Sequence, residues 1–172
     1  MSKGYRVISA DCIISITHCY NGVKNNAVGG EPVTNSEATI LETDMITYVI
    51  QGLVSVSEAT QHIEASRFLD EKNSKKASYR PIHANRQPAE GMLFINQGKI
   101  MIRDICPEGV SDITDPEHPI TLTKVTTTVI RTETKTFVIA GVYHHNPNGW
   151  MEIPLRDVKG TTPTKKSAYT FL

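Results

Sequence analysis

Apolar and polar positions along the chain predict strands towards both ends. Residues 5–19 are rich in Ile and Val and contain no Pro or Gly, which indicates one long strand or two short strands broken near Asp11. The segments MLFI and KIMIRDI flank residues 96–98, Asn-Gln-Gly, which predicts a hairpin with a short glycine turn. Further strands are expected in ITLTKVTTTVIRT and KTFVIAGVYHH, joined across residues 133–134, and in WMEIPL.

The middle of the chain predicts two helices. Apolar pairs at 40/41, 45/46, 49/50 and 53/54 recur every four to five residues, which favours a helix over 37–54. The threonines and Gly52 argue against it, and a terminal strand around 53–56 is the alternative. A second helix is expected over about 57–73, because Ser55 and Glu58 form a capping-box pattern. One face of this helix would carry Ala59, His62, Ile63, Ser66 and Leu69.

These patterns predict an α+β fold with an N-terminal strand, one or two central helices and a C-terminal antiparallel β-meander. The 172 residues suffice for one domain with a substantial core, expected over 1–160, and residues 161–172 would form an extended C-terminal tail. Residues 20–36, rich in Asn and Gly, are expected to form a long loop. We find no convincing internal repeat in the sequence.

Charge and cysteine content limit the classes of partner. Lys plus Arg equals Asp plus Glu at 18 each, so no strong nucleic-acid binding is expected, and a neutral surface resists self-association less than a charged one. Three cysteines make a disulfide framework improbable and favour a reducing compartment. With no signal-peptide pattern and no apolar run of roughly 20 residues, we expect a protein that is cytoplasmic or assembled into a particle there, away from membranes.

The stretch HHNPNGW at 144–150 places two adjacent histidines near the only tryptophan, which looks like a metal site or a catalytic pair. Neighbouring side chains on a strand point to opposite faces, so His144 and His145 should not share a metal ion. Asn146 to Gly149 has the residue types of a type I turn. The stretch therefore predicts the end of a hairpin, with Trp150 packing across from one histidine.

The other candidate groups have ordinary structural interpretations. Cys12, His18 and Cys19 would not converge on a metal if they lie along one strand, and His62 would lie half-buried on the second helix. His83 lies between Arg80 and Arg86 in a loop that could bind an anion. An acidic cluster lacks the glycine and the final glutamate of an EF-hand loop; it comprises Asp112, Asp115, Glu117 and His118. No cofactor or metal site is predicted.

Three classes of function fit the sequence. Nucleophile, nucleotide-binding and zinc-protease motifs are absent, which favours a non-enzymatic structural subunit that forms a ring or tube with copies of itself and with other structural subunits, such as a phage tail tube, neck or connector. The alternatives are a peptide- or ligand-binding module that uses the 20–36 and 77–91 loops, and a small hydrolase-like enzyme that uses scattered histidines and carboxylates. The residues predicted to form an assembly interface are Val28, Glu31, Pro32, Tyr169, Phe171 and Leu172.

Overall fold

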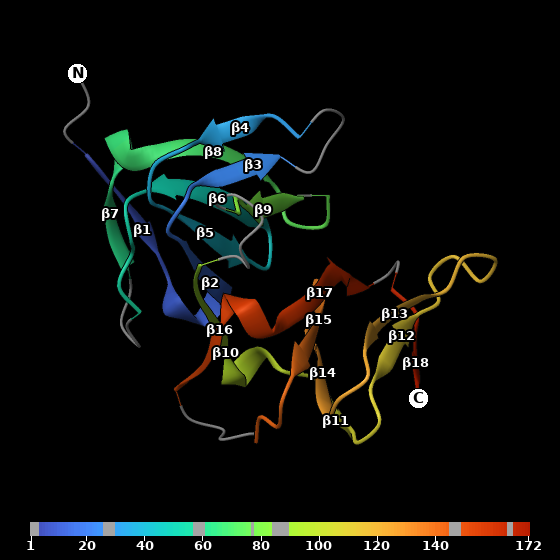
Figure 1. The fold of residues 1–172 in the computed structure, drawn as a ribbon. Coiled ribbons are helices and arrows are strands. Elements are labelled where there is room, and N and C mark those ends of the chain that lie inside the picture. The colour runs from blue at the N-terminus through green and yellow to red at the C-terminus, as the bar shows by residue number, and fades with distance from the viewer. Residues whose placement is uncertain are drawn as a thin grey trace.

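The fold is nearly all β, so the expected α+β class with central helices is wrong (Figure 1). The computed structural model describes residues 4–25, 30–56, 61–76, 78–83, 90–144, 149–164 and 167–172. The helices that lie wholly within these ranges are four 3-10 helices of three residues each, η1 Ala10–Cys12, η2 Ala65–Arg67, η3 Gln97–Lys99 and η4 Leu155–Asp157. The strands are β1 Tyr5–Ile8, β2 Ile13–Cys19, β3 Val23–Asn25, β4 Pro32–Thr34, β5 Ala38–Thr43, β6 Ile46–Gln51, β7 Gln61–Glu64, β8 Phe68–Asn73, β9 Tyr79–Pro81, β10 Gly91–Asn96, β11 Ile102–Cys106, β12 Val110–Asp112, β13 Ile120–Thr123, β14 Thr127–Arg131, β15 Lys135–Ala140, β16 Trp150–Pro154, β17 Val158–Pro163 and β18 Tyr169–Phe171.

The strands form two copies of one unit, repeat 1 (residues 4–83) and repeat 2 (residues 90–172). Repeat 1 contains a sheet of order β2-β5-β6-β8, a pair β1-β7 and a small sheet β4-β3-β9. Repeat 2 contains the same three parts in the same order along the chain, β11-β14-β15-β17, β10-β16 and β13-β12-β18. Each repeat therefore has nine strands that correspond one to one.

The register of the pairs shows that this correspondence extends to single residues. Tyr5 lies opposite Glu64 in β1-β7, and Met92 lies opposite Pro154 in β10-β16, at equivalent places in the two repeats. The irregularity in β6-β8 at Val49/Ile50 recurs in β15-β17 at Val138/Ile139. Equivalent residues are 87 positions apart in the first strands, as in Ile8 and Ile95, 89 in the central hairpin and 90 in the last strands.

When the two repeats are aligned by their structure, similar segments become visible in the sequence. The expectation that no repeat exists is therefore wrong. ATILETDMITYVIQG at 38–52 aligns with TTVIRTETKTFVIAG at 127–141, and KKASY at 75–79 aligns with KKSAY at 165–169. Identical buried residues at equivalent described positions are Ile8/Ile95, Cys19/Cys106, Val23/Val110, Thr39/Thr128, Thr43/Thr132, Thr47/Thr136, Val49/Val138, Ile50/Ile139 and Ile63/Ile153.

Both faces of each central sheet are buried, which explains why the first predicted helix is wrong. In repeat 1, one face packs against a cluster that includes Ile8, Leu41 and Ile63, and the other against a cluster that includes Val23 and Val49. A strand buried on both faces shows adjacent apolar residues in place of alternation. The pairs at 40/41 and 49/50 therefore belong to β5 and β6, two strands of a hairpin, and the alternative strand at 53–56 is not formed either.

The second predicted helix is also wrong in its described part. Residues 61–73 form β7, η2 and β8, and residues 57–60 lie outside the described residues. Burial alternates along β7, with Gln61 and Ile63 buried and His62 and Glu64 exposed, so the pattern has the period of a strand.

Most of the expected strands exist, but several pair differently. The break near Asp11 is confirmed, because η1 separates β1 from β2, and the hairpin joined across residues 133–134 is confirmed as β14-β15. The expected hairpin across residues 96–98 is wrong: β10 pairs with β2 and β16, whereas β11 pairs with β14. The hairpin that would lead into Trp150 is also wrong, because β15 pairs with β14 and β17, and β16 pairs with β10.

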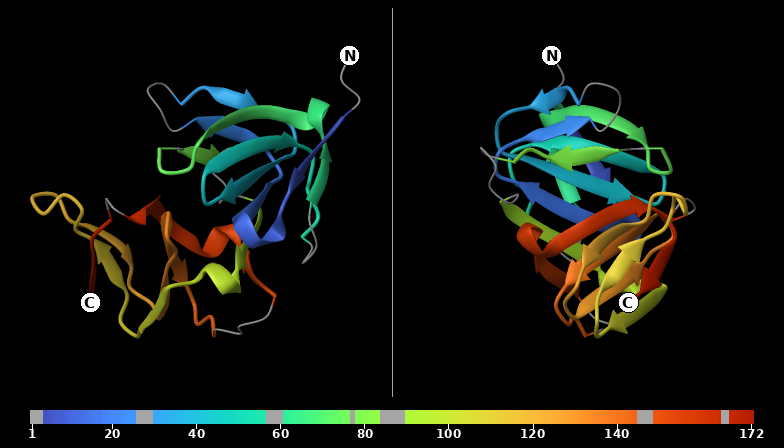
Figure 2. Two further views of the ribbon diagram at one scale, coloured as in Figure 1. Left: turned by 180° about the vertical axis from the view of Figure 1, so that it is seen from behind. Right: turned by 45° about the vertical axis from the view of Figure 1, so that its right-hand side comes forward.

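The two repeats are joined by strand addition. β10 of repeat 2 pairs antiparallel with β2, the edge strand of the repeat 1 sheet, and this creates a six-stranded sheet of order β16-β10-β2-β5-β6-β8. Figure 1 and Figure 2 show β10 and β16 beside β2, between the two repeats. Leu93 and Ile95 of β10 also pack against Phe137 and Ile139 of their own repeat. The pair β10-β16 therefore covers one sheet and extends the other.

Candidate functional site

Two strand edges stand out because their equivalents in the other repeat are paired. β10 uses one edge for β16 and the other for β2, whereas its equivalent β1 pairs only with β7 among the described residues. β2 pairs with β5 and β10, whereas its equivalent β11 pairs only with β14 in the same described ranges. β1 and β11 lie on opposite sides of the molecule in Figure 1. An unpaired edge presents rows of backbone N–H and C=O groups to a further strand.

Exposed apolar side chains lie on both of these edges. Tyr5 and Val7 of β1 are 63% and 60% exposed, and Ile102 and Ile105 of β11 are 49% and 39% exposed. The equivalents of Tyr5 and Val7 on β10, Met92 and Phe94, are half-buried at the junction between the repeats. Burial of such side chains stabilises a contact in proportion to the apolar area removed from water. We define β1 and β11 together as the open edges.

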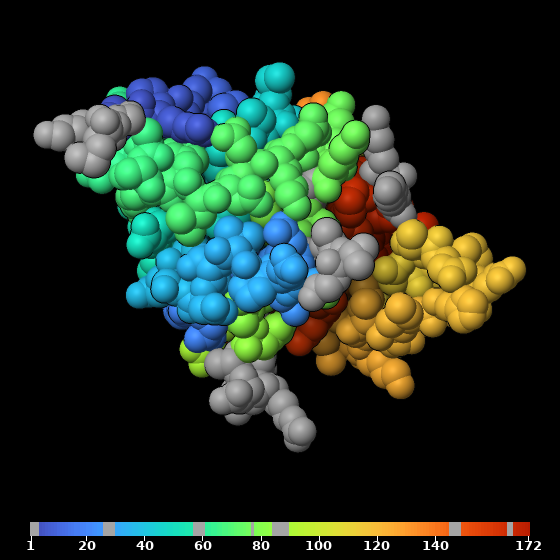
Figure 3. Space-filling view, turned by 90° about the horizontal axis from the view of Figure 1, so that it is seen from above, coloured from blue at the N-terminus to red at the C-terminus, as the bar shows by residue number. Residues whose placement is uncertain are grey.

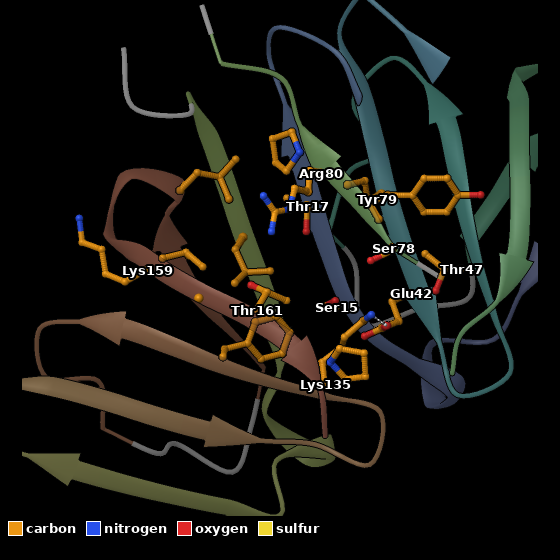
Figure 4. Close-up of a pocket in the computed structure, with 18 of the residues that line it drawn as sticks. Ser15, Thr17, Glu42, Thr47, Ser78, Tyr79, Arg80, Lys135, Lys159 and Thr161 are labelled. Carbon is orange, nitrogen blue, oxygen red and sulfur yellow. Dashed lines mark ion pairs between the residues drawn. The ribbon is translucent and has the colours of Figure 1, made fainter. Parts of the chain in front are cut away.

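A cavity of about 480 Å³ lies between the two repeats (Figure 4). Its walls come from β2, β5, β6 and the segment 78–83 of repeat 1, and from β10, β15, η4 and β17 of repeat 2. The apolar part of the lining includes Ile40, Leu93, Phe137 and Val158. Such a cavity has the size of a small-molecule site.

An ion pair between the repeats lies in the cavity wall. Lys135 Nζ lies 3.8 Å from Glu42 Oε2, and the side chains are 13% and 3% exposed (Figure 4). Neither carboxylate oxygen of Glu42 makes a hydrogen bond to any part of the chain that the structure describes. Burial raises the pKa of Glu42 to about 7, and the nearby Lys135 ammonium offsets only part of that shift.

Basic groups predominate around the cavity. Arg80 and His83 of repeat 1 and Arg156 and Lys159 of repeat 2 all line it, and Glu42 is its only acidic lining residue among those the structure describes. Arg80, Arg156 and Lys159 are exposed, so solvent reaches this rim. The arrangement suits an anion with an apolar body.

The predicted interface residues that the structure describes lie in or next to two edge strands, β4 of repeat 1 and β18 of repeat 2. Val28 lies outside the described residues, while Glu31 and Pro32 are exposed at the start of β4. Phe171 and Leu172 are 53% and 49% exposed at β18, which pairs with β12 of the same repeat. The end of the expected tail is thus an edge strand of repeat 2, and β17 runs across the expected boundary at 160.

Tyr169 has a different role from its two neighbours. It is half-buried, packs in the cluster of Cys106, Val110 and Val138, and its hydroxyl lies 2.6 Å from Thr162 Oγ1. Its equivalent Tyr79 in repeat 1 packs in the corresponding cluster. Tyr169 is therefore part of an interior shared by both repeats.

The histidines lie in separate surroundings. His18 Nε2 is 2.6 Å from the Val54 carbonyl oxygen, and the ring packs edge-on against Phe94. His62 is exposed on β7, a strand in place of the expected helix, and His144 is exposed beyond β15. Only His83 of the described histidines lines the cavity. The second histidine of HHNPNGW, His145, and residues 146–148 of the turn that follows lie outside the described residues.

The remaining candidates make local contacts. The acidic cluster forms a turn in which Asp115 Oδ2 lies 3.0 Å from His118 Nδ1, both side chains being mostly exposed. Cys19 is buried, and burial raises the pKa of its thiol to about 12. In the described ranges no group of three or more His, Cys, Asp or Glu side chains has the arrangement of a metal site. Arg86 lies outside those ranges.

Sequence reasoning missed both the open edges and the cavity, and the sequence carries a signal only for the edges. The aligned segments 38–52 and 127–141 would have revealed the repeat and therefore the equivalence of β1 with β10. The cavity needs the pairing of β2 with β10, which brings together residues more than 70 positions apart. No local pattern specifies that pairing.

Comparison of the chain with models of protein families, with curated proteins and with solved structures found no match. Among the described residues, no helix has the length and apolar character needed to cross a membrane.

Proposed function

We propose that this protein is a structural subunit that assembles with copies of itself through the open edges. The observation that carries the proposal is the junction between the repeats, where β10 adds to β2 and extends a sheet. The chain already contains one such junction, and the equivalent strands β1 and β11 present the two halves of another. A unit that joins its own copy within a chain has surfaces suited to joining copies between chains.

The exposed apolar residues support the same proposal. Long unpaired edges with apolar side chains favour aggregation unless a partner covers them. Tyr5, Val7, Ile102 and Ile105 lie on strands whose equivalents are covered. An assembly partner would bury these four side chains and pair the backbone groups of both strands.

The test is sedimentation velocity over a range of protein concentrations. The native chain should form species larger than its 19.0 kDa monomer. Val7→Lys combined with Ile105→Lys replaces an exposed apolar side chain on each open edge with a lysine and should give monomers, since an added lysine on an edge opposes strand pairing. Met45→Lys is the matched control, because Met45 is 72% exposed in the β5-β6 turn and should not alter assembly. A native chain that stays monomeric at every concentration overturns the proposal.

A second candidate function is the binding of a small amphipathic anion in the cavity between the repeats. The observation that favours it is the combination of an apolar lining with a basic rim that includes Arg80, Arg156 and Lys159. Octanoate has matching chemistry, with an apolar body and one carboxylate. Titration with octanoate should shift amide resonances of β15 and β17 first, and Arg156→Glu with Lys159→Glu should weaken binding severalfold. Shifts spread evenly over the chain would contradict a specific site.

A further inference from the structure

The geometry points to a specific head-to-tail junction in which β1 of one copy pairs antiparallel with β11 of the next, in the register that β10 and β2 use within the chain. This inference rests on the proposed self-assembly and specifies its surface. Within the chain, Met92 lies opposite His18, Leu93 opposite Thr17 and Ile95 opposite Ser15.

Transfer of this register to the open edges pairs residues of matching chemistry at three positions, whereas Val7 lies opposite Arg103. Residues 4–8 are equivalent to 91–95, and residues 102–106 are equivalent to 15–19. Tyr5 of one copy then lies opposite Ile105 of the next, and Ile8 opposite Ile102. Arg6 lies opposite Asp104, a pair of opposite charges directly across the junction. Opposite residues in an antiparallel pair share a face, so both kinds of contact are favourable.

The charged pair adds information that the internal junction lacks. At the internal junction the equivalent residues are Leu93 and Thr17, which carry no charge. Arg6 already lies 3.1 Å from Glu71 and packs over the Phe68 ring, which holds its guanidinium near the open edge. A guanidinium has five N–H donors, so Arg6 can keep Glu71 and still donate to a second carboxylate.

A glycine at the equivalent place fits the same junction. Gly91 pairs with Cys19, and a Cβ at Gly91 would lie 1.9 Å from the carbonyl oxygen of His18. The close approach of β10 to β2 therefore requires glycine at this position. Gly4 stands at the equivalent position before β1, and the proposed register places it opposite Cys106 of the next copy.

The two open edges differ, so the junction is heterologous: each copy offers β1 at one end and β11 at the other. Such junctions continue from copy to copy until they close a ring or extend a filament. The rotation between repeats within the chain should recur between chains, because the same pairing produces both. An assembly of n chains would then present 2n equivalent repeats.

The first test is a charge exchange across the junction. Arg6→Glu alone and Asp104→Lys alone each place like charges opposite one another and should weaken self-association roughly tenfold or more. An equimolar mixture of the two variants should assemble as the native chain does, because each junction in an alternating assembly then pairs opposite charges. Co-assembly of two variants that are separately monomeric supports the head-to-tail register. A mixture that stays monomeric while the native chain assembles overturns it.

The second test is cross-linking by disulfide formation between two differently labelled chains. Tyr5→Cys in one chain and Ile105→Cys in the other should form a disulfide on mild oxidation, because the register places them opposite. Ile102→Cys in place of Ile105→Cys is the matched control, with the same residue type on the same strand at similar exposure. Cys12→Ser is included in every chain, since Cys12 is only half-buried whereas Cys19 and Cys106 are buried.

These experiments separate the two proposals. A native chain that assembles but shows neither co-assembly nor the position 5 to position 105 cross-link disproves the register and leaves self-assembly intact. A native chain that never assembles disproves both. Equal cross-linking at positions 102 and 105 also disproves the register.

Discussion

Gly22 and Gly109 occupy the same place in the two repeats and face the same steric limit. Both have a left-handed backbone, with φ of 99° and 109°, and an added Cβ would lie 2.2 Å from the Thr34 carbonyl oxygen and 2.3 Å from that of Thr123. We expect Gly22→Ala and Gly109→Ala each to lower the free energy of unfolding by more than about 1 kcal/mol.

Urea denaturation checks this expectation. Gly98→Ala is the control, because an added Cβ there would meet its nearest neighbour, Asn96 Oδ1, at 3.4 Å. If only one of the two glycine variants lowers the free energy of unfolding, the claim that both glycines face the same steric limit is contradicted.

Glu42 makes stability depend on pH at the junction. Burial raises its folded pKa from 4.5 to about 7, so the folded chain holds the proton more tightly than the unfolded chain. Its contribution to stability is fully present below pH 4.5 and is lost as the pH rises through 7.

Between pH 5 and pH 8 the free energy of unfolding of the native chain should therefore fall by about 1–3 kcal/mol relative to that of Glu42→Gln, whose side chain cannot titrate. Urea midpoints at both pH values measure this difference. The exposed Glu117→Gln variant should follow the native chain. Parallel pH dependence of the native chain and Glu42→Gln would show that Glu42 is not responsible.

At the scale of elements, the central hairpin of each repeat contains a buried threonine at an equivalent position, which bonds the segment that follows the hairpin. Thr39 Oγ1 donates to the Gly52 carbonyl oxygen at 2.8 Å and accepts from the Val54 N–H at 2.9 Å. Thr128 makes the equivalent bonds to Gly141 and Tyr143 at 2.7 and 3.1 Å. Both side chains are fully buried, so the hydroxyl satisfies backbone groups that water cannot reach.

Thr39→Val and Thr128→Val keep the shape of the side chain and remove both bonds. Each variant should lower the free energy of unfolding by about 1–3 kcal/mol, the range for leaving buried polar groups unpaired. Thermal unfolding of both variants measures the cost, with the exposed Thr170→Val on β18 as control. A change no larger than that of Thr170→Val would contradict a stabilising role for these hydroxyls.

Strands could be predicted from sequence where β-branched and aromatic residues cluster, and could not where adjacent apolar pairs recur at a helix-like spacing. Residues 135–140 of β15 and 150–154 of β16 were expected as strands because β-branched and aromatic residues cluster there. Ile40, Leu41, Val49 and Ile50 gave a helical spacing because the sheet of repeat 1 is covered on both faces. Tertiary packing therefore overrode the local pattern.

At the scale of the whole molecule, pairing between distant strands decides the architecture. The open edges, the cavity and the Glu42–Lys135 pair all depend on β10 joining β2, and neither strand carries a signal for that partner. Four predicted interface residues at β4 and β18 are exposed, namely Glu31, Pro32, Phe171 and Leu172. The residues that the internal junction singles out, Tyr5, Val7 and Ile105, were not among those predicted. Alignment of the two repeats was the missing step.

The most direct measurement is a reconstruction of the assembled native protein by electron cryomicroscopy. The proposed junction predicts a ring or filament in which the rotation from repeat 1 to repeat 2 within a chain equals that from repeat 2 to repeat 1 of the next chain. It also predicts continuous density from β1 of one copy to β11 of its neighbour. Copies that meet through β8, β13 or β18, or related by two-fold axes that pair like edges, would contradict it.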